Sequence, residues 1–202
     1  MTGETRQHTS ERRMGRTMAV IGLAVIGLGT IASSALFTDS ANVSNNSFTN
    51  GTVDIATDPA STALSAGNMA PGDTVYGTVK VSNSGTLALR YAMTSSATNA
   101  DSKALASQLQ MTIKSGVSTC DAAGFSAGST VYNAGVLGGL GAAAAVIGDT
   151  ATGQQSGDRT LAAGTDETLC VRVSLPSGTS NSFQGASTTA TFTFAAEQTT
   201  NN

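Results

Sequence analysis

Histidine and cysteine carry most catalytic and metal-binding chemistry in proteins, and this 202-residue chain has few of either. Its one histidine is His8, and its two cysteines are Cys120 and Cys170. Zinc hydrolysis normally needs two histidine ligands and a general base, and serine or cysteine catalysis needs a histidine base. No histidine follows residue 8. The sequence therefore predicts no catalytic residue, no metal and no other cofactor.

Other reactive groups do not form a recognisable pattern. Three aspartates near the start of the chain could offer oxygen ligands to Ca²⁺: Asp39, Asp54 and Asp58. A calcium site of this kind stays open, although surface acids in an acidic exported chain are usually solvated. A serine–lysine pair would have to use Lys80, Lys103 or Lys114, which lie on separate predicted elements. The glycine-rich residues 135–141 lack the Gly-Lys-Ser/Thr ending of a phosphate loop.

The two cysteines favour a disulfide. Both follow the apolar segment at the start of the chain, and paired cysteines in an exported protein are usually joined. A Cys120–Cys170 bond would close a loop of fifty residues, worth roughly 4 kcal/mol in the chain-entropy model. The alternative is two unlinked small residues.

Residues 1–35 have the pattern of a signal peptide. Four arginines precede a long apolar run, which ends in small residues. We predict cleavage after Ala35, with Leu36 as the second choice. The alternative is an uncleaved anchor, since the run is nearly long enough to span a bilayer; this would be the chain's only contact with a membrane.

The rest of the chain is acidic and has a thin supply of core residues. From residue 36 onward six bases face eleven acids, a net charge of about −5. No basic patch remains, which argues against nucleic acid as a partner. Leu, Ile, Val and Phe make up 31 of these 167 residues. A domain with so small a core gains from a disulfide or from assembly with neighbours.

Alternating apolar and polar residues predict a chain of short β-strands. The clearest are residues 74–81 and 168–175; in the second, apolar residues occupy the odd positions, which puts Cys170 on the opposite face. Further strands are predicted over residues 48–55, 87–93, 110–114, 130–132 and 190–196, and a short helix over 101–109. Residues 135–157 are predicted to form a long surface excursion, with a hairpin as the alternative. Such a pattern is typical of an all-β fold, an antiparallel β-sandwich with one short helix.

The domain organisation follows from these elements. We predict a signal peptide over residues 1–35, an exposed N-terminal segment over 36–47, a β-sandwich domain over 48–198 and a polar tail over 199–202.

Several short motifs occur in the order found in one known family. They are Gly29-Thr30, Ala35-Leu36-Phe37-Thr38-Asp39, Asn46, Phe48, Gly51-Thr52-Val53-Asp54-Ile55, Pro71-Gly72-Asp73, Asn83-Ser84-Gly85-Thr86, Leu161-Ala162-Ala163-Gly164 and Phe192-Thr193-Phe194. With these motifs the chain resembles the TasA–camelysin group, exported proteins of Gram-positive bacteria whose signal is cut by a SipW-type signal peptidase.

The resemblance implies a jelly-roll-like sandwich that is secreted into the extracellular matrix or onto the cell surface. TasA-like members polymerise into biofilm-matrix fibres, in which the N-terminal segment of one subunit adds as a strand to the next. In this chain the matching donor-strand candidates are Phe37, Thr38, Asp39 and Val43. The implied partners are the signal peptidase during export and other copies of the chain.

Three hypotheses are therefore carried forward. The first is a secreted structural protein that forms fibres by strand exchange. The second is a monomeric secreted binding module that contacts a glycan or a surface protein. The third, the least favoured, is a metallopeptidase, the class to which camelysin-like relatives are assigned.

Overall fold

The strands with the clearest alternation form the centre of the fold. In the computed structural model, which describes residues 50–60, 64–66 and 68–200, β2 (Thr74–Asn83) pairs antiparallel with β9 (Asp166–Ser174). Val79 lies opposite Leu169, and both are buried. Because side chains alternate along a strand, the polar residues between them turn to the other face of the sheet.

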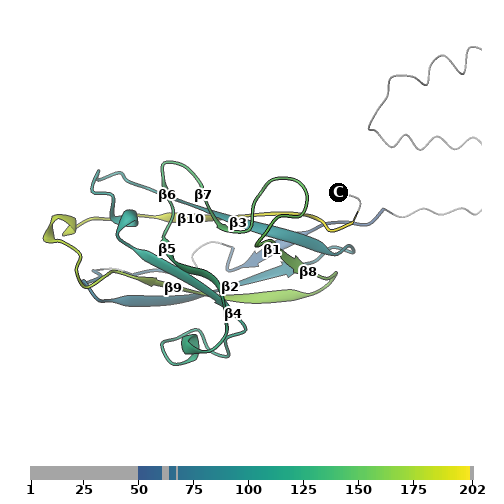
Figure 1. Cartoon of the computed structure of the whole chain (residues 1–202), viewed down its shortest axis with the longest axis horizontal. Coiled ribbons are helices and arrows are strands. Elements are labelled where there is room, and N and C mark those ends of the chain that lie inside the picture. Colours follow the sequence, from purple (N-terminus) through teal and green to yellow (C-terminus); the bar gives the residue numbers. More distant parts are fainter. Residues whose placement is uncertain (1–49, 61–63, 67, 201–202) are drawn as a thin grey trace, which may run out of the picture. The chain divides into compact units, whose positions relative to one another are not determined.

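Two sheets are packed face to face (Figure 1). The first sheet has the strand order β1-β2-β9-β4-β5, and the second is built on β3, which pairs with β10 and with β6, β7 and β8. The remaining strands are β1 (Ile55–Asp58), β3 (Leu89–Ala97), β4 (Gln110–Ser115), β5 (Ser129–Val136), β6 (Gly139–Leu140), β7 (Ala144–Ile147), β8 (Arg159–Leu161) and β10 (Ala190–Gln198). Every pairing among them is antiparallel except that of β3 with β6.

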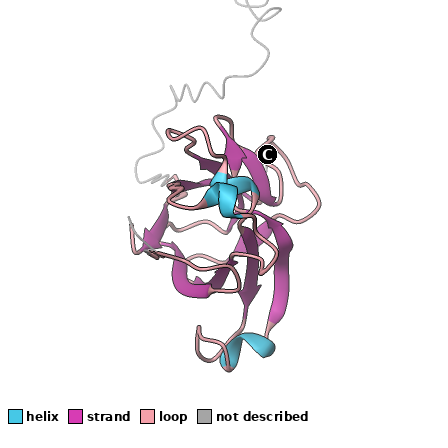
Figure 2. Ribbon diagram, turned by 90° about the vertical axis from the view of Figure 1, so that its left-hand side faces the viewer, coloured by secondary structure: helices cyan, strands magenta, loops and turns pink. Residues whose placement is uncertain are grey.

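The core lies between the two sheets and confirms the predicted all-β sandwich. Its largest fully buried side chains include Tyr91, Met93 and Leu89 from β3 and Met111 and Ile113 from β4. In the described residues the helical turns are three short 3₁₀ segments, η1 (Leu105–Ser107), η2 (Gly124–Ser126) and η3 (Asn181–Phe183) (Figure 2). In the described part of the chain no helix has the length and apolar character needed to cross a membrane.

The predicted first strand is wrong in its position. Residues 50–54 form no strand, and β1 begins only at Ile55. The Thr52 carbonyl instead accepts hydrogen bonds from the backbone N–H groups of Thr86 and Leu87, which belong to the turn before β3. Gly85 permits this approach, because a Cβ there would lie 2.3 Å from the Thr52 oxygen. Alternation alone does not show that the pairing partner is a turn.

The predicted helix over residues 101–109 is also wrong, since only η1 forms there. Ala104 before it is left-handed, with φ of 55°, so the helix cannot extend backwards. Asp101 does not cap a helix either. Its carboxylate accepts hydrogen bonds from the backbone N–H groups of Lys103 and Ser187, and so ties this segment to a distant loop.

The predicted excursion over residues 135–157 is partly sheet. It contains β6 and β7, which pair with β3. Leu137, Val146 and Ile147 are buried in the main core. The glycine and alanine content of this stretch hid two strands too short to show an alternating pattern.

Candidate functional site

The strand β10 forms one edge of the second sheet. It pairs with β3 from Ala190 to Gln198, and among the described strands none pairs with the other side of its residues 190–196. An edge of this kind presents unpaired N–H and C=O groups to another chain. Proteins usually protect such an edge with charges or proline, yet residues 190–196 contain neither.

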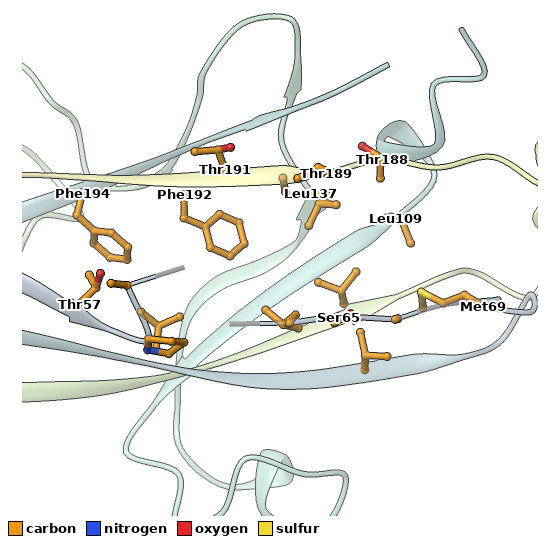
Figure 3. Close-up of a pocket in the computed structure, with 18 residues that line it drawn as sticks. Thr57, Ser65, Met69, Leu109, Leu137, Thr188, Thr189, Thr191, Phe192 and Phe194 are labelled. Carbon is orange, nitrogen blue, oxygen red and sulfur yellow. The ribbon is translucent and has the colours of Figure 1, made fainter. Parts of the chain in front are cut away.

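A cavity of about 610 Å³ runs beneath this edge, between the two sheets (Figure 3). Phe192 and Phe194 point into it from β10, and Thr57 of β1 lies across from them. We call this cavity the β10 groove. The other residues that line it are Pro59, Ala60, Leu64, Ser65, Ala66, Met69, Val75, Val79, Leu109, Leu137, Val173, Thr188, Thr189, Ala190 and Thr191.

The lining decides what the β10 groove can do. Its size falls within the roughly 300–1,000 Å³ of ligand-binding pockets, and most of its side chains are apolar. The described residues that line it include no Asp, Glu, His, Lys, Arg, Cys or Tyr. This lining is suited to binding an apolar segment.

The sequence-predicted site residues divide into two sets. The cleavage positions Ala35 and Leu36 lie outside the described residues. The donor-strand candidates also lie there: Phe37, Thr38, Asp39 and Val43. Cys120 and Cys170, in contrast, are described and form a disulfide with Cα atoms 5.4 Å apart, as predicted.

The disulfide fastens a loop to the outer face of the first sheet. Phe125 from this loop is buried and packs edge-on against Tyr76, with ring centres 5.5 Å apart. Lys114 and Arg172 lie over the same ring, at 5.2 Å and 4.8 Å from its centre. Cation–π contacts of this kind favour the packed loop. The predicted position of the disulfide, across the outside of a sheet, is confirmed.

A polar network joins the two sheets inside the sandwich. Glu167 of β9 accepts hydrogen bonds from Tyr91 of β3, at 2.7 Å, and from Arg159 of β8. Burial would raise the pKa of Glu167, but the bonds from Arg159 and Tyr91 outweigh it and the pKa is lowered. Burial, with the bond to Glu167, raises the pKa of Tyr91. All three groups have partners, which makes this network structural.

Metal-ligating residues do not gather in the part of the chain that the structure describes. No three His, Cys, Asp or Glu side chains there are placed to hold a metal ion. The three lysines considered for serine–lysine chemistry bind elsewhere: Lys80 pairs with Asp166, while Lys103 and Lys114 donate to backbone carbonyls. Among the described residues, the available donors thus do not gather into a zinc or calcium centre.

Sequence reasoning missed the β10 groove. The alternation of Phe192 and Phe194 predicts a strand, and both residues do pack against the core. What the alternation cannot show is that β10 is an edge strand, because that depends on the order of strands in the sheet. The only signal in the sequence is the absence of charge and proline across residues 190–196.

A comparison with known families adds one finding. A family model described as camelysin metallo-endopeptidase matches residues 10–117, just over half of the 202 residues. The match extends from the predicted signal peptide through β4 and leaves out the disulfide and β10. The matched residues contain no histidine. The comparison with curated proteins finds no match.

Proposed function

Because the chain belongs to the camelysin metallo-endopeptidase family, as its resemblance to the TasA–camelysin group implies, we propose that it is an exported structural protein of the extracellular matrix or cell surface. After cleavage next to Ala35, the freed N-terminal segment of one copy adds as a strand to the β10 edge of another. The observation that supports this proposal is an unprotected edge strand lying over an apolar groove.

Strand addition uses both parts of this site. Main-chain hydrogen bonds to residues 190–196 supply affinity, and side-chain pockets between the sheets set the register. Phe37 and Val43 of the incoming segment, six residues apart, point to the same side of an extended strand. The β10 groove offers apolar surface to such side chains beside Phe192 and Phe194.

The energetics favour an added strand. Phe192 and Phe194 are only partly buried, although both pack against the core. Covering apolar area contributes about 25 cal/mol per Å² removed from water. A neighbouring copy that covers these rings would thus complete a core in which large apolar residues are scarce.

The test is assembly of a chain that begins at Phe37. We expect it to form filaments with rising concentration, seen by electron microscopy and sedimentation. The same chain without residues 37–46 should stay monomeric, with an unchanged circular dichroism spectrum. Filaments that persist after this deletion would contradict strand exchange, and a monomeric parent chain would favour the secreted binding module.

The family description also suggests a metallopeptidase activity as a hypothesis to test. The absence of histidine after residue 8 is the sequence argument against it. We expect the purified chain to leave casein intact, both with added Zn²⁺ and after treatment with a chelator. Cleavage that a chelator abolishes and Zn²⁺ restores would overturn this expectation, and a zinc peptidase assayed beside it serves as the positive control.

A further inference from the structure

Two cations that have no carboxylate partner among the described residues share the face of the first sheet that carries the disulfide. Lys114 is the register partner of Cys170 across β4 and β9. Arg172 lies two residues further along the same face of β9. Lys80, Arg90 and Arg159 form ion pairs with carboxylates, whereas Lys114 and Arg172 are in none of these pairs.

We propose that Cys120–Cys170 is an exchange-competent disulfide, which external low-molecular-weight thiols open by attack on Cys120. This makes the pair a site of reversible S-thiolation. The inference does not depend on the proposed assembly, because the disulfide lies on the outer face of the first sheet, whereas the β10 groove lies between the sheets.

Access selects the sulfur that is attacked. Cys170 is fully buried in the middle of β9, whereas Cys120 is partly exposed in the loop between β4 and β5. A thiolate from solvent therefore reaches the Cys120 Sγ first. Exchange rates depend on which sulfur is accessible as well as on the thiols themselves.

Charge selects the sulfur that leaves. A thiolate is stabilised by neighbouring Lys and Arg, and a better-stabilised thiolate leaves faster. Cys170 has Lys114 and Arg172 on its face of the sheet. The Sγ of Cys120 instead lies 3.2 Å from the carbonyl oxygen of Gly77, whose negative end disfavours a thiolate there.

The step balances as an ordinary thiol–disulfide exchange. The external thiolate forms a bond to the Cys120 Sγ, the bond between the two protein sulfurs breaks, and Cys170 keeps the electron pair as a thiolate. A second external thiolate then attacks the outer sulfur of the mixed disulfide, which releases an oxidised small-molecule disulfide and leaves Cys120 reduced. The loop over residues 116–128 then loses its covalent tether, although Phe125 still contacts Tyr76.

The first test identifies the attacked sulfur. The protein, expressed from its full 202-residue sequence, is mixed with glutathione, quenched early with iodoacetamide and mapped by mass spectrometry. We expect glutathione on Cys120 and the alkyl group on Cys170. Glutathione mainly on Cys170, or a disulfide that resists glutathione in the folded protein, would overturn the proposal.

The second test measures the role of charge. Lys114→Gln and Arg172→Gln should each slow reduction by about threefold, because a less stabilised thiolate leaves more slowly. Arg172→Lys, which keeps the charge, should retain most of the parent rate. Lys103→Gln is the matched control, because Lys103 donates to Gln184 on a different loop. Equal rates in all four variants would refute the role of the two cations.

Discussion

Aspartate at positions 191 and 193 is expected to prevent assembly of the chain while leaving its fold intact. Thr191 and Thr193 are exposed on β10, so their replacement removes no core contact. Aspartate is disfavoured in strands, and charged side chains on an edge strand oppose its pairing with another chain. We expect the critical concentration for filaments to rise at least about tenfold, which corresponds to 1.4 kcal/mol.

A matched variant separates this edge effect from charge alone. Thr74 and Thr78 are exposed threonines of β2, in the other sheet, where β2 pairs with β9. The Thr74→Asp/Thr78→Asp variant adds the same charge and should assemble like the parent. If both variants lose their filaments equally, general repulsion is the cause and the β10 edge is not the acceptor. If Thr191→Asp/Thr193→Asp still assembles normally, the acceptor lies elsewhere.

The strands that the sequence predicts correctly are those with a buried and an exposed face. β2, β9 and β10 have this form, and their alternating residues point as expected. β6 and β7 were hidden because a strand of two to four small residues carries too little apolar contrast. The segment 101–109 has apolar residues at helical spacing, but the hydrogen bonds that the Asp101 carboxylate accepts and the left-handed Ala104 hold it in a loop.

The disulfide could be predicted from the sequence, whereas the β10 groove could not. A disulfide needs only two cysteines and a suitable compartment, and the odd–even pattern of β9 placed Cys170 on the outer face. The β10 groove arises from residues of β1, β2, β9 and β10 together. Whether those strands border a gap depends on the order in which they join the sheets, which local patterns do not encode.

Replacing Glu167 should destabilise the fold far more than replacing its neighbour Asp166. The Glu167 and Arg159 side chains are 16% and 29% exposed, whereas those of Asp166 and Lys80 are 49% and 45% exposed. Removing one partner of a buried ion pair leaves the other charge buried and unpaired, which costs about 3–5 kcal/mol of folding stability. Exposed ion pairs contribute about 0–1 kcal/mol. Partial exposure places Glu167→Ala near the lower end, at about 3 kcal/mol, and Asp166→Ala below about 1 kcal/mol. Denaturant unfolding at pH 7 measures both values.

The pH dependence gives this prediction a second readout. The folded pKa of Glu167 lies below its ordinary 4.5, so its contribution is present above pH 4.5 and is lost as the pH falls through the lowered pKa. The stability difference between the parent and Glu167→Gln should therefore shrink in acid. At the other end, the raised pKa of Tyr91 means that stability falls as the pH rises above 10, where the unfolded tyrosine ionises. A parent–variant difference that stays constant from pH 7 to pH 2 would show that Glu167 acts by packing, and that its charge does not hold the two sheets together.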